Sequence, residues 1–176
     1  MNSLRNFEGG IITAALTPLT PSGDIKENSL SDFISFQIKN EIKGFFLLGT
    51  YGEGLAIHPR KRVYFLEKFL NHVSSKTLVN VSSTASKLSL ELAKHAANLG
   101  VGAISLLPPI YYTQDLEGLV KYFSLFSKID LPVLIYNNPQ RQNYDITPSI
   151  FEHIVHEVPN LKGVKDSSGS IERVQL

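Results

Sequence analysis

Short apolar runs recur along the chain, and most of them are almost continuously apolar. From the second run onward they begin about 25 to 35 residues apart, which is the length of a strand-loop-helix unit. Strands that are buried on both faces of a parallel sheet show such a pattern. The sequence therefore predicts six parallel strands, within residues 10–16, 44–48, 78–82, 103–106, 133–136 and 161–166.

Helical patterns lie between these runs, because apolar residues recur there at spacings of three and four. Pro59 and Pro148 suit the start of the second and fifth helices, and Gly100 suits the end of the third. A sixth helix is expected near Ile171. The periodic positions are Leu30, Phe33, Ile34, Ile38 and Ile42; Val63, Leu66, Leu70 and Val73; Leu88, Leu92 and Ala96; Leu116, Leu119, Phe123 and Phe126; and Ile150 and Ile154.

Alternating strands and helices belong to an α/β protein, either an open doubly wound sheet or a closed barrel. A dinucleotide-binding sheet needs a Gly-rich turn after its first strand, but Thr17-Pro18-Leu19 stands there. The pattern favours a (β/α)8 TIM barrel, of which this chain covers about the first six βα units. Residues 1–176 are thus expected to form a single barrel domain that is incomplete at its C-terminus, as a portion of a longer protein.

Composition excludes several classes of partner. Seventeen basic and 16 acidic residues give a net charge of +1, and no basic run indicates nucleic-acid binding. The absence of cysteine excludes disulfides and thiolate chemistry. Residues 1–10 lack the apolar run of a signal peptide, and no apolar run approaches the roughly 20 residues that span a bilayer. We expect a cytoplasmic protein without a membrane partner.

Lys165 near the end of the sixth strand is the first candidate for chemistry. The C-terminal strand ends of a parallel barrel meet at one mouth, and an amine in a partly dry mouth loses its proton more easily and attacks carbonyls. No histidine, paired carboxylate or metal-ligand cluster falls at the other ends, so neither metal hydrolysis nor serine–histidine catalysis is supported. The other ends supply hydroxyls and phenols instead: Thr50, Tyr51, Tyr111, Tyr112 and Tyr136.

Each candidate also has a plainer interpretation. The loop 49–54 contains three glycines, which suit either a carboxylate-binding backbone or a tight turn. Tyr136 would serve as a core aromatic, Tyr111 and Tyr112 would pack an extended loop, Arg141 would be solvated in a polar loop, and Lys165 would reach water. The histidines fall on helices or at their starts and are expected at the surface or in packing: His58, His72, His95, His153 and His156.

Three motifs together resemble the dihydrodipicolinate synthase and N-acetylneuraminate lyase family. They are Gly49-Thr50-Tyr51-Gly52-Glu53, Tyr136-Asn137-Asn138-Pro139 and Gly163-Val164-Lys165-Asp166-Ser167-Ser168-Gly169. The resemblance implies a (β/α)8 barrel, usually a tetramer of two tight dimers. It also implies class I aldolase chemistry on pyruvate or another 2-oxo acid, without a metal or organic cofactor.

The resemblance assigns roles to individual residues. Lys165 matches the Schiff-base lysine, Tyr136 the general acid and base, and Thr50 the hydroxyl of its proton relay. Tyr111, or else Tyr112, matches the relay tyrosine that a second subunit contributes across the tight dimer. The backbone at Thr50 and Tyr51 would hold the pyruvate carboxylate, and Arg141 would bind the carboxylate of the aldehyde substrate.

Two departures keep the reaction open. Tyr51 stands where the family commonly has threonine, and the stretch Asn80–Ser83 lacks the glycines often found after the third strand. A dihydrodipicolinate synthase-like condensation of pyruvate with an aldehyde is the first expectation. The alternatives are a 2-keto-3-deoxy sugar-acid aldolase or N-acetylneuraminate lyase-like cleavage, and a non-catalytic protein that binds a 2-oxo acid or a partner subunit.

Overall fold

One parallel sheet organises the molecule. The computed structural model describes residues 9–73 and 76–175. The strands pair in chain order and confirm the six predicted units: β1 (Ile12–Ala14), β2 (Gly44–Leu47), β3 (Thr77–Asn80), β4 (Ala103–Leu106), β5 (Val133–Asn137) and β6 (Leu161–Asp166). Within the described residues, β1 and β6 each pair with one neighbour only.

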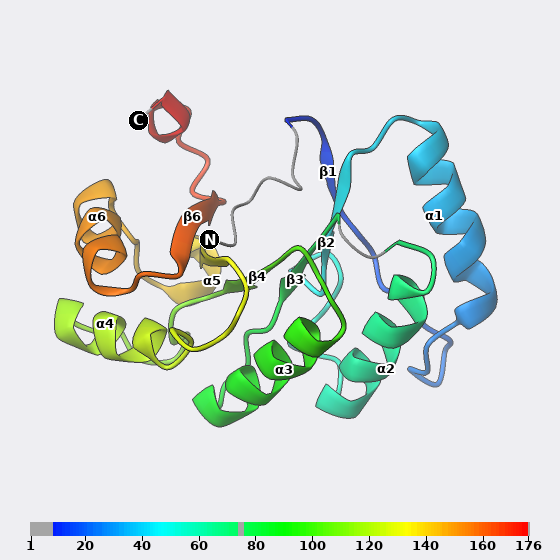
Figure 1. The fold of residues 1–176 in the computed structure, drawn as a ribbon, viewed down its shortest axis with the longest axis horizontal. Helices are drawn as coiled ribbons and strands as arrows, with labels where there is room; N and C mark the ends of the chain where they lie inside the picture. Colours follow the sequence, from blue (N-terminus) through cyan, green and yellow to red (C-terminus); the bar gives the residue numbers. More distant parts are fainter. Residues whose placement is uncertain (1–8, 74–75, 176) are drawn as a thin grey trace.

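The five longer helices follow the outer side of this curved sheet, and the two unpaired edges face each other across its open side (Figure 1). The helices are α1 (Leu30–Lys39), α2 (Pro59–Leu70), α3 (Ser86–Asn98), α4 (Leu116–Ser124), α5 (Pro139–Gln142) and α6 (Pro148–Glu157), with 3₁₀ turns η2 (Glu27–Ser29) and η3 (Glu172–Gln175). Among the residues described, no helix is long and apolar enough to cross a membrane.

Two elements differ from the sequence predictions. The segment around Arg141 was expected as a polar loop but forms the short helix α5, which Pro139 opens and Asn143 closes with φ 64°. The last element is the 3₁₀ turn η3 rather than the start of an α-helix. Residues 1–8, which the signal-peptide argument used, lie outside the described part of the chain.

The inner strands β2 to β5 bury both faces, as their continuous apolar pattern predicts. Outward side chains of successive strands join the main core beneath the helices, for example Phe45, Leu47, Val79, Ile104 and Ile135. Inward side chains form a second, smaller cluster, namely Phe46, Leu78, Ala103, Leu107 and Tyr136. The inner face therefore has an apolar floor, and polar groups gather above it at the C-terminal strand ends.

A buried polar network joins three of these strand ends. The Arg62 guanidinium, 2% exposed, donates to the carbonyls of Ser82 (2.8 Å) and Asn80 (2.9 Å). Asn80 donates to the Leu48 carbonyl at 2.9 Å, while Ser82 Oγ donates to Asn80 Oδ1 and accepts from the Leu107 backbone N–H. Burial lowers the pKa of Arg62 to about 10, so it remains a cation at neutral pH. These side chains, rather than glycines, shape the turn after β3.

Candidate active site

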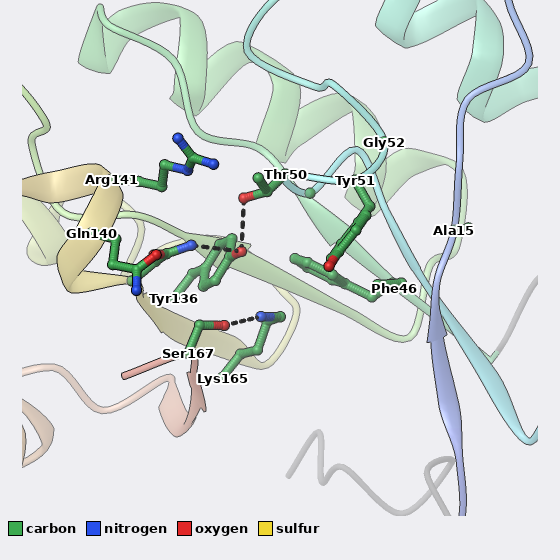
Figure 2. Close-up of a pocket in the computed structure, with 13 residues that line it drawn as sticks. Ala15, Phe46, Thr50, Tyr51, Gly52, Tyr136, Gln140, Arg141, Lys165 and Ser167 are labelled. Atoms are coloured by element: carbon green, nitrogen blue, oxygen red, sulfur yellow. Dashed lines mark hydrogen bonds between the residues drawn. The ribbon is translucent and has the colours of Figure 1, made fainter. Parts of the chain in front are cut away.

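A cavity of about 390 Å³ opens at the C-terminal ends of the strands. Figure 2 shows that its walls come from β1, β2, β5, β6 and α5, so distant parts of the sequence meet there. The lining residues are Ala14, Ala15, Phe46, Gly49, Thr50, Tyr51, Gly52, Tyr136, Asn138, Gln140, Arg141, Lys165 and Ser167. Five of the predicted site residues therefore meet in one cavity: Thr50, Tyr51, Tyr136, Arg141 and Lys165.

Register brings Lys165 next to Tyr136. The two residues are direct partners in the parallel pairing of β5 with β6, so their side chains project to the same face. Lys165 Nζ lies 3.9 Å from the centre of the Tyr136 ring and 5.1 Å from that of Phe46. It donates to Ser167 Oγ at 2.7 Å. The half-buried amine is thus held by one hydrogen bond and two ring faces.

Tyr136 is both a core aromatic and a polar group of the cavity. Its ring packs edge-on against Phe46, with centroids 5.4 Å apart, and the residue is 3% exposed. Its hydroxyl lies 3.0 Å from Thr50 Oγ1 and 3.2 Å from Asn138 Nδ2. Burial acts to raise the pKa of Tyr136, but the hydrogen bonds from Thr50 and Asn138 and the charge of Lys165 outweigh it and lower the pKa below its usual value.

The glycines of loop 49–54 allow close backbone packing rather than unusual torsions. Positive φ falls instead on Leu48 (56°) and Glu53 (53°). A Cβ on Gly54 would lie 1.9 Å from the Leu48 carbonyl oxygen, and one on Gly52 would lie 2.9 Å from that of Ala15. The loop consequently packs against the end of β1 and carries the side chains of residues 50 and 51 to the cavity wall. A carboxylate-binding role for its backbone stays a prediction.

Tyr51 and Arg141 occupy different parts of the cavity. Tyr51 is 71% exposed and extends toward Phe46, on the side where Lys165 lies (Figure 2). Arg141 stands on α5, near Thr50 and away from the amine. It also lines an adjoining cavity with Thr50 and Tyr136. Arg141, Thr50 and Tyr136 therefore lie between the amine cavity and this adjoining cavity.

The cavity also contains Asn138, Gln140 and Ser167, which the sequence analysis did not select as site residues. Asn138 and Ser167 do lie within the quoted motifs, beside Tyr136 and Lys165. Their nearness in sequence could have suggested them. The direction of their side chains depends on how each chain segment turns after its strand, and no sequence pattern gave that direction.

Tyr111 and Tyr112 do not line the Lys165 cavity. They are 76% and 78% exposed and border a separate groove with Pro109, Tyr122 and Leu125. Their expected contribution across a dimer stays a prediction. The five histidines also lie outside the cavity. Over the described residues, no group of three or more His, Cys, Asp or Glu could hold a metal ion.

Six parallel βα units, with an amine and a phenol at adjacent strand ends, form the first part of a (β/α)8 barrel. A sequence model described as the dihydrodipicolinate synthetase family matches residues 7–176. The chain belongs to this family.

Relatives with assigned activities support the same family membership. The chain is 32% identical over 168 residues to a 4-hydroxy-tetrahydrodipicolinate synthase of Bartonella tribocorum, covering 94% of this chain and 57% of that protein. It is 30% identical over 174 residues to the enzyme of the same name from a Sulfurovum species, covering 97% of this chain and 58% of that protein. The chain spans a little over half the length of these relatives.

Solved structures show the same architecture. A catalytic lysine mutant of the Ruminococcus gnavus sialic acid aldolase superposes with a TM-score of 0.88 at 28% identity, over 99% of this chain and 58% of that one. YagE is a dihydrodipicolinic acid synthase family protein of Escherichia coli K12, solved in complex with pyruvate. It superposes with a TM-score of 0.89 at 27% identity, over 94% of this chain and 57% of that one. These similarities confirm the predicted family and the six-unit barrel segment.

Proposed function

We propose that this chain carries the amine-bearing part of a pyruvate-dependent class I aldolase, with Lys165 as the Schiff-base residue. The contact of Lys165 Nζ with the Tyr136 ring carries the proposal, because it places an amine and a hydrogen-bonded phenol in one cavity. The faces of aromatic rings attract cations, and the protonated imine carries such a charge.

The chemistry proceeds through an imine. Neutral Lys165 Nζ adds to the keto carbon of pyruvate, the keto oxygen takes up protons and leaves as water, and a protonated imine remains. A methyl proton is then lost, and its C–H electron pair forms the enamine. The enamine carbon attacks the aldehyde carbon, whose oxygen is protonated, and water hydrolyses the new imine to restore the amine. Because the imine itself accepts the electrons, we propose that no cofactor takes part.

Tyr136 and Thr50 would move these protons. The Tyr136 hydroxyl lies within hydrogen-bond distance of Thr50, so the pair can pass a proton between the cavity and the keto oxygen. The backbone at Thr50 and Tyr51 would bind the pyruvate carboxylate. Tyr111 would join the relay of a second subunit, so the active unit would be a homo-oligomer. This assembly and the cytoplasmic location stay predictions.

Arg141 favours an acidic aldehyde as the second substrate. Its guanidinium borders both the amine cavity and the adjoining one, where a carboxylate would find a bidentate partner. This supports a dihydrodipicolinate synthase-like condensation. The similarity to a sialic acid aldolase supports retro-aldol cleavage of a sugar acid as the second candidate. Arg141→Ala should weaken use of an acidic aldehyde selectively, while release of pyruvate and a neutral aldehyde sugar from a sugar acid would favour the second candidate.

Borohydride reduction in the presence of pyruvate tests the central step. We expect peptide mass spectrometry to find a reduced pyruvyl adduct on Lys165. Lys162→Met is the matched control, since Lys162 is an exposed lysine on the same strand, and it should leave the adduct unchanged. An unmodified Lys165 in folded protein would refute the proposal. Pyruvate binding without an adduct would favour the non-catalytic alternative.

A further inference from the structure

Asn137 ends β5 directly behind the cavity and is fully buried, yet it does not line the cavity. Its amide nitrogen donates to Asp166 Oδ1 at 2.7 Å and to Asp145 Oδ1 at 2.9 Å. Its amide oxygen accepts from Gln142 Nε2 at 2.7 Å and from the Ile146 backbone N–H at 3.1 Å. Both donor hydrogens and both acceptor positions of this amide are used, so its orientation is fixed.

One branch runs from Asn137 to the amine. The Asn137 carbonyl accepts from the backbone N–H of Ser167 at 2.8 Å. Ser167 Oγ in turn accepts from Lys165 Nζ at 2.7 Å. The residue that holds the amine is therefore anchored on the strand that carries Tyr136.

A second branch runs from Asn137 to the phenol. Gln142, 1% exposed, donates to the Asn137 amide oxygen, and its own Oε1 accepts from the Asn138 backbone N–H at 3.1 Å. Asn138 Nδ2 then donates to the Tyr136 hydroxyl at 3.2 Å. The short helix α5 thus supplies the link between the amide and the general acid–base group.

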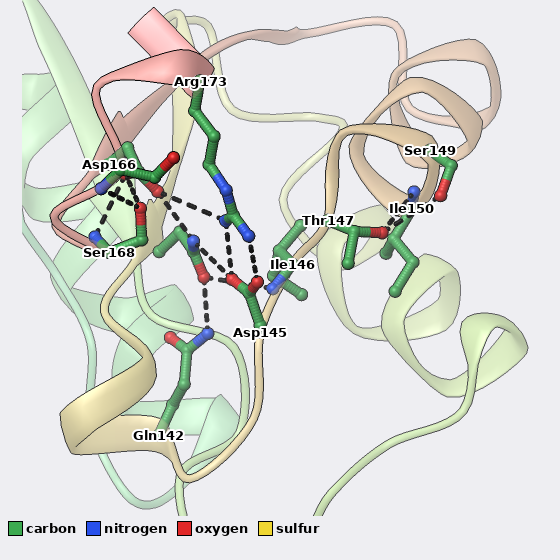
Figure 3. Close-up of polar contacts among 11 residues, drawn as sticks. Gln142, Asp145, Ile146, Thr147, Ser149, Ile150, Asp166, Ser168 and Arg173 are labelled. Carbon is green, nitrogen blue, oxygen red and sulfur yellow. Dashed lines mark hydrogen bonds and ion pairs between the residues drawn. The ribbon is translucent and has the colours of Figure 1, made fainter.

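Charged groups brace the amide from outside. Arg173 of η3 bonds both oxygens of Asp145, one of them at 2.8 Å from Nη1, and lies 3.9 Å from Asp166 (Figure 3). Asp166 also accepts from the Ser168 backbone N–H at 3.0 Å. Three segments that follow β5, α5 and β6 consequently converge on one side chain. A buried amide with all of its hydrogen bonds made is rigid, which suits the positioning of reactive groups.

We propose that Asn137 is a positioning residue that fixes the Lys165 amine and the Tyr136 hydroxyl relative to each other through two separate hydrogen-bond branches. The inference rests on the proposed function, because it assigns the purpose of the network to imine chemistry at Lys165. Asn137 contacts neither pyruvate nor the reacting atoms and acts only through Ser167 and through Gln142 with Asn138.

Two measurements distinguish the branch to Lys165 from the branch to Tyr136, and neither requires the aldehyde substrate. The rate of borohydride trapping with pyruvate reports imine formation, and exchange of the pyruvate methyl protons in D₂O reports proton transfer by Tyr136. Gln142→Glu keeps the side-chain shape but turns a carboxylate oxygen toward the Asn137 oxygen, so it should slow exchange about tenfold and leave trapping unchanged. Ser167→Ala should slow trapping first. Asn137→Asp should slow both, by up to about 100-fold.

Asn160→Asp is the matched control. Asn160 is a half-buried asparagine that donates to the carbonyls of Phe126 and Ile129 at the opposite end of β6. Its loss should lower stability without changing the ratio of exchange to trapping. If Gln142→Glu slows both steps equally, or changes neither, the branched network is refuted. If Asn137→Asp does not fold, Gln142→Glu and Ser167→Ala still decide the question.

A measurement without substrate separates this inference from the proposed function. The titration of Tyr136 is obtained from the ultraviolet difference between each protein and its Tyr136→Phe counterpart. Gln142→Glu should raise the pKa of Tyr136, because Asn138 would no longer be held against the hydroxyl. If pyruvate is not trapped by the unmodified chain, the proposed function fails, while a shifted titration still supports the network. An unshifted titration would overturn it.

Discussion

At the scale of single residues, the surroundings of Tyr136 determine what it can do. The hydroxyl is held by Thr50 and Asn138 rather than by bulk water, and Lys165 adds a positive charge beside the ring. Burial alone would make the phenol a weaker acid, but these groups reverse that effect and lower its pKa. The phenol can therefore give up its proton more readily than an isolated tyrosine.

Replacement of Tyr136 by phenylalanine tests this role. Tyr136→Phe should keep imine formation but slow exchange of the pyruvate methyl protons by about 10²- to 10⁴-fold, the usual size of general acid–base catalysis. Tyr144→Phe is the control, since it removes a comparable hydroxyl that donates to the Pro109 carbonyl outside the cavity. An unchanged exchange rate in Tyr136→Phe would exclude the phenol from proton transfer.

The Asp145–Arg173 ion pair predicts a pH-dependent contribution to stability. The bond from Arg173 is the main cause that lowers the pKa of Asp145 from its ordinary 3.8. A depressed pKa in the folded state stabilises the protein above the unfolded-state value, and this stabilisation disappears as pH falls through the folded-state value. Asp145→Asn should therefore lower the melting temperature at pH 7, and the difference should vanish well below pH 3.8. A difference that persists in acid would rule out the ion pair as its cause.

At the scale of elements, the close approach of loop 49–54 to its own strand makes Gly54 structurally necessary. A Cβ there would meet the Leu48 carbonyl oxygen at 1.9 Å, and backbone cannot move aside cheaply. Gly54→Ala should cost about 1 to 3 kcal/mol of unfolding free energy and displace Thr50 from Tyr136. Gly9→Ala meets nothing within 4 Å and serves as the control in chemical denaturation. Equal stability of the two variants would contradict the predicted clash.

Long periodic elements were predictable, and short or cross-strand features were not. The apolar runs predicted all six strands, and the signal is clearest where both faces are buried, as in β2. The four-residue helix α5 is too short for a helical period, so Arg141 was expected in a loop. The adjacency of Lys165 to Tyr136 follows from a register with a bulge at Val133 and Leu134, which no local pattern reveals. The Asn137 network could not be predicted from local patterns either, because it joins side chains from segments that are separated in the sequence.

At the scale of the whole molecule, six of the family's eight βα units leave two sheet edges without a partner strand in the described chain. Ile12 on β1 and Val164 on β6 are 40% and 42% exposed. Unpaired edges with apolar side chains promote association between chains. Residues of both edge strands, Ala14 of β1 and Lys165 of β6, also line the amine cavity. Stability and chemistry at this scale thus depend on what covers the gap between β1 and β6.

Supplying two further βα units should change both properties together. The chain matches 57% of the Bartonella tribocorum relative, and the unmatched C-terminal part of that protein can be fused to residues 1–176. We expect this fusion to self-associate less than the chain alone. Light scattering and sedimentation measure this difference. Enclosing the cavity removes water from the imine, so borohydride trapping at Lys165 should also be faster in the fusion. The same fusion with Lys165→Arg controls for nonspecific labelling. Equal association and equal trapping in chain and fusion would show that the open edges do not limit this half-barrel.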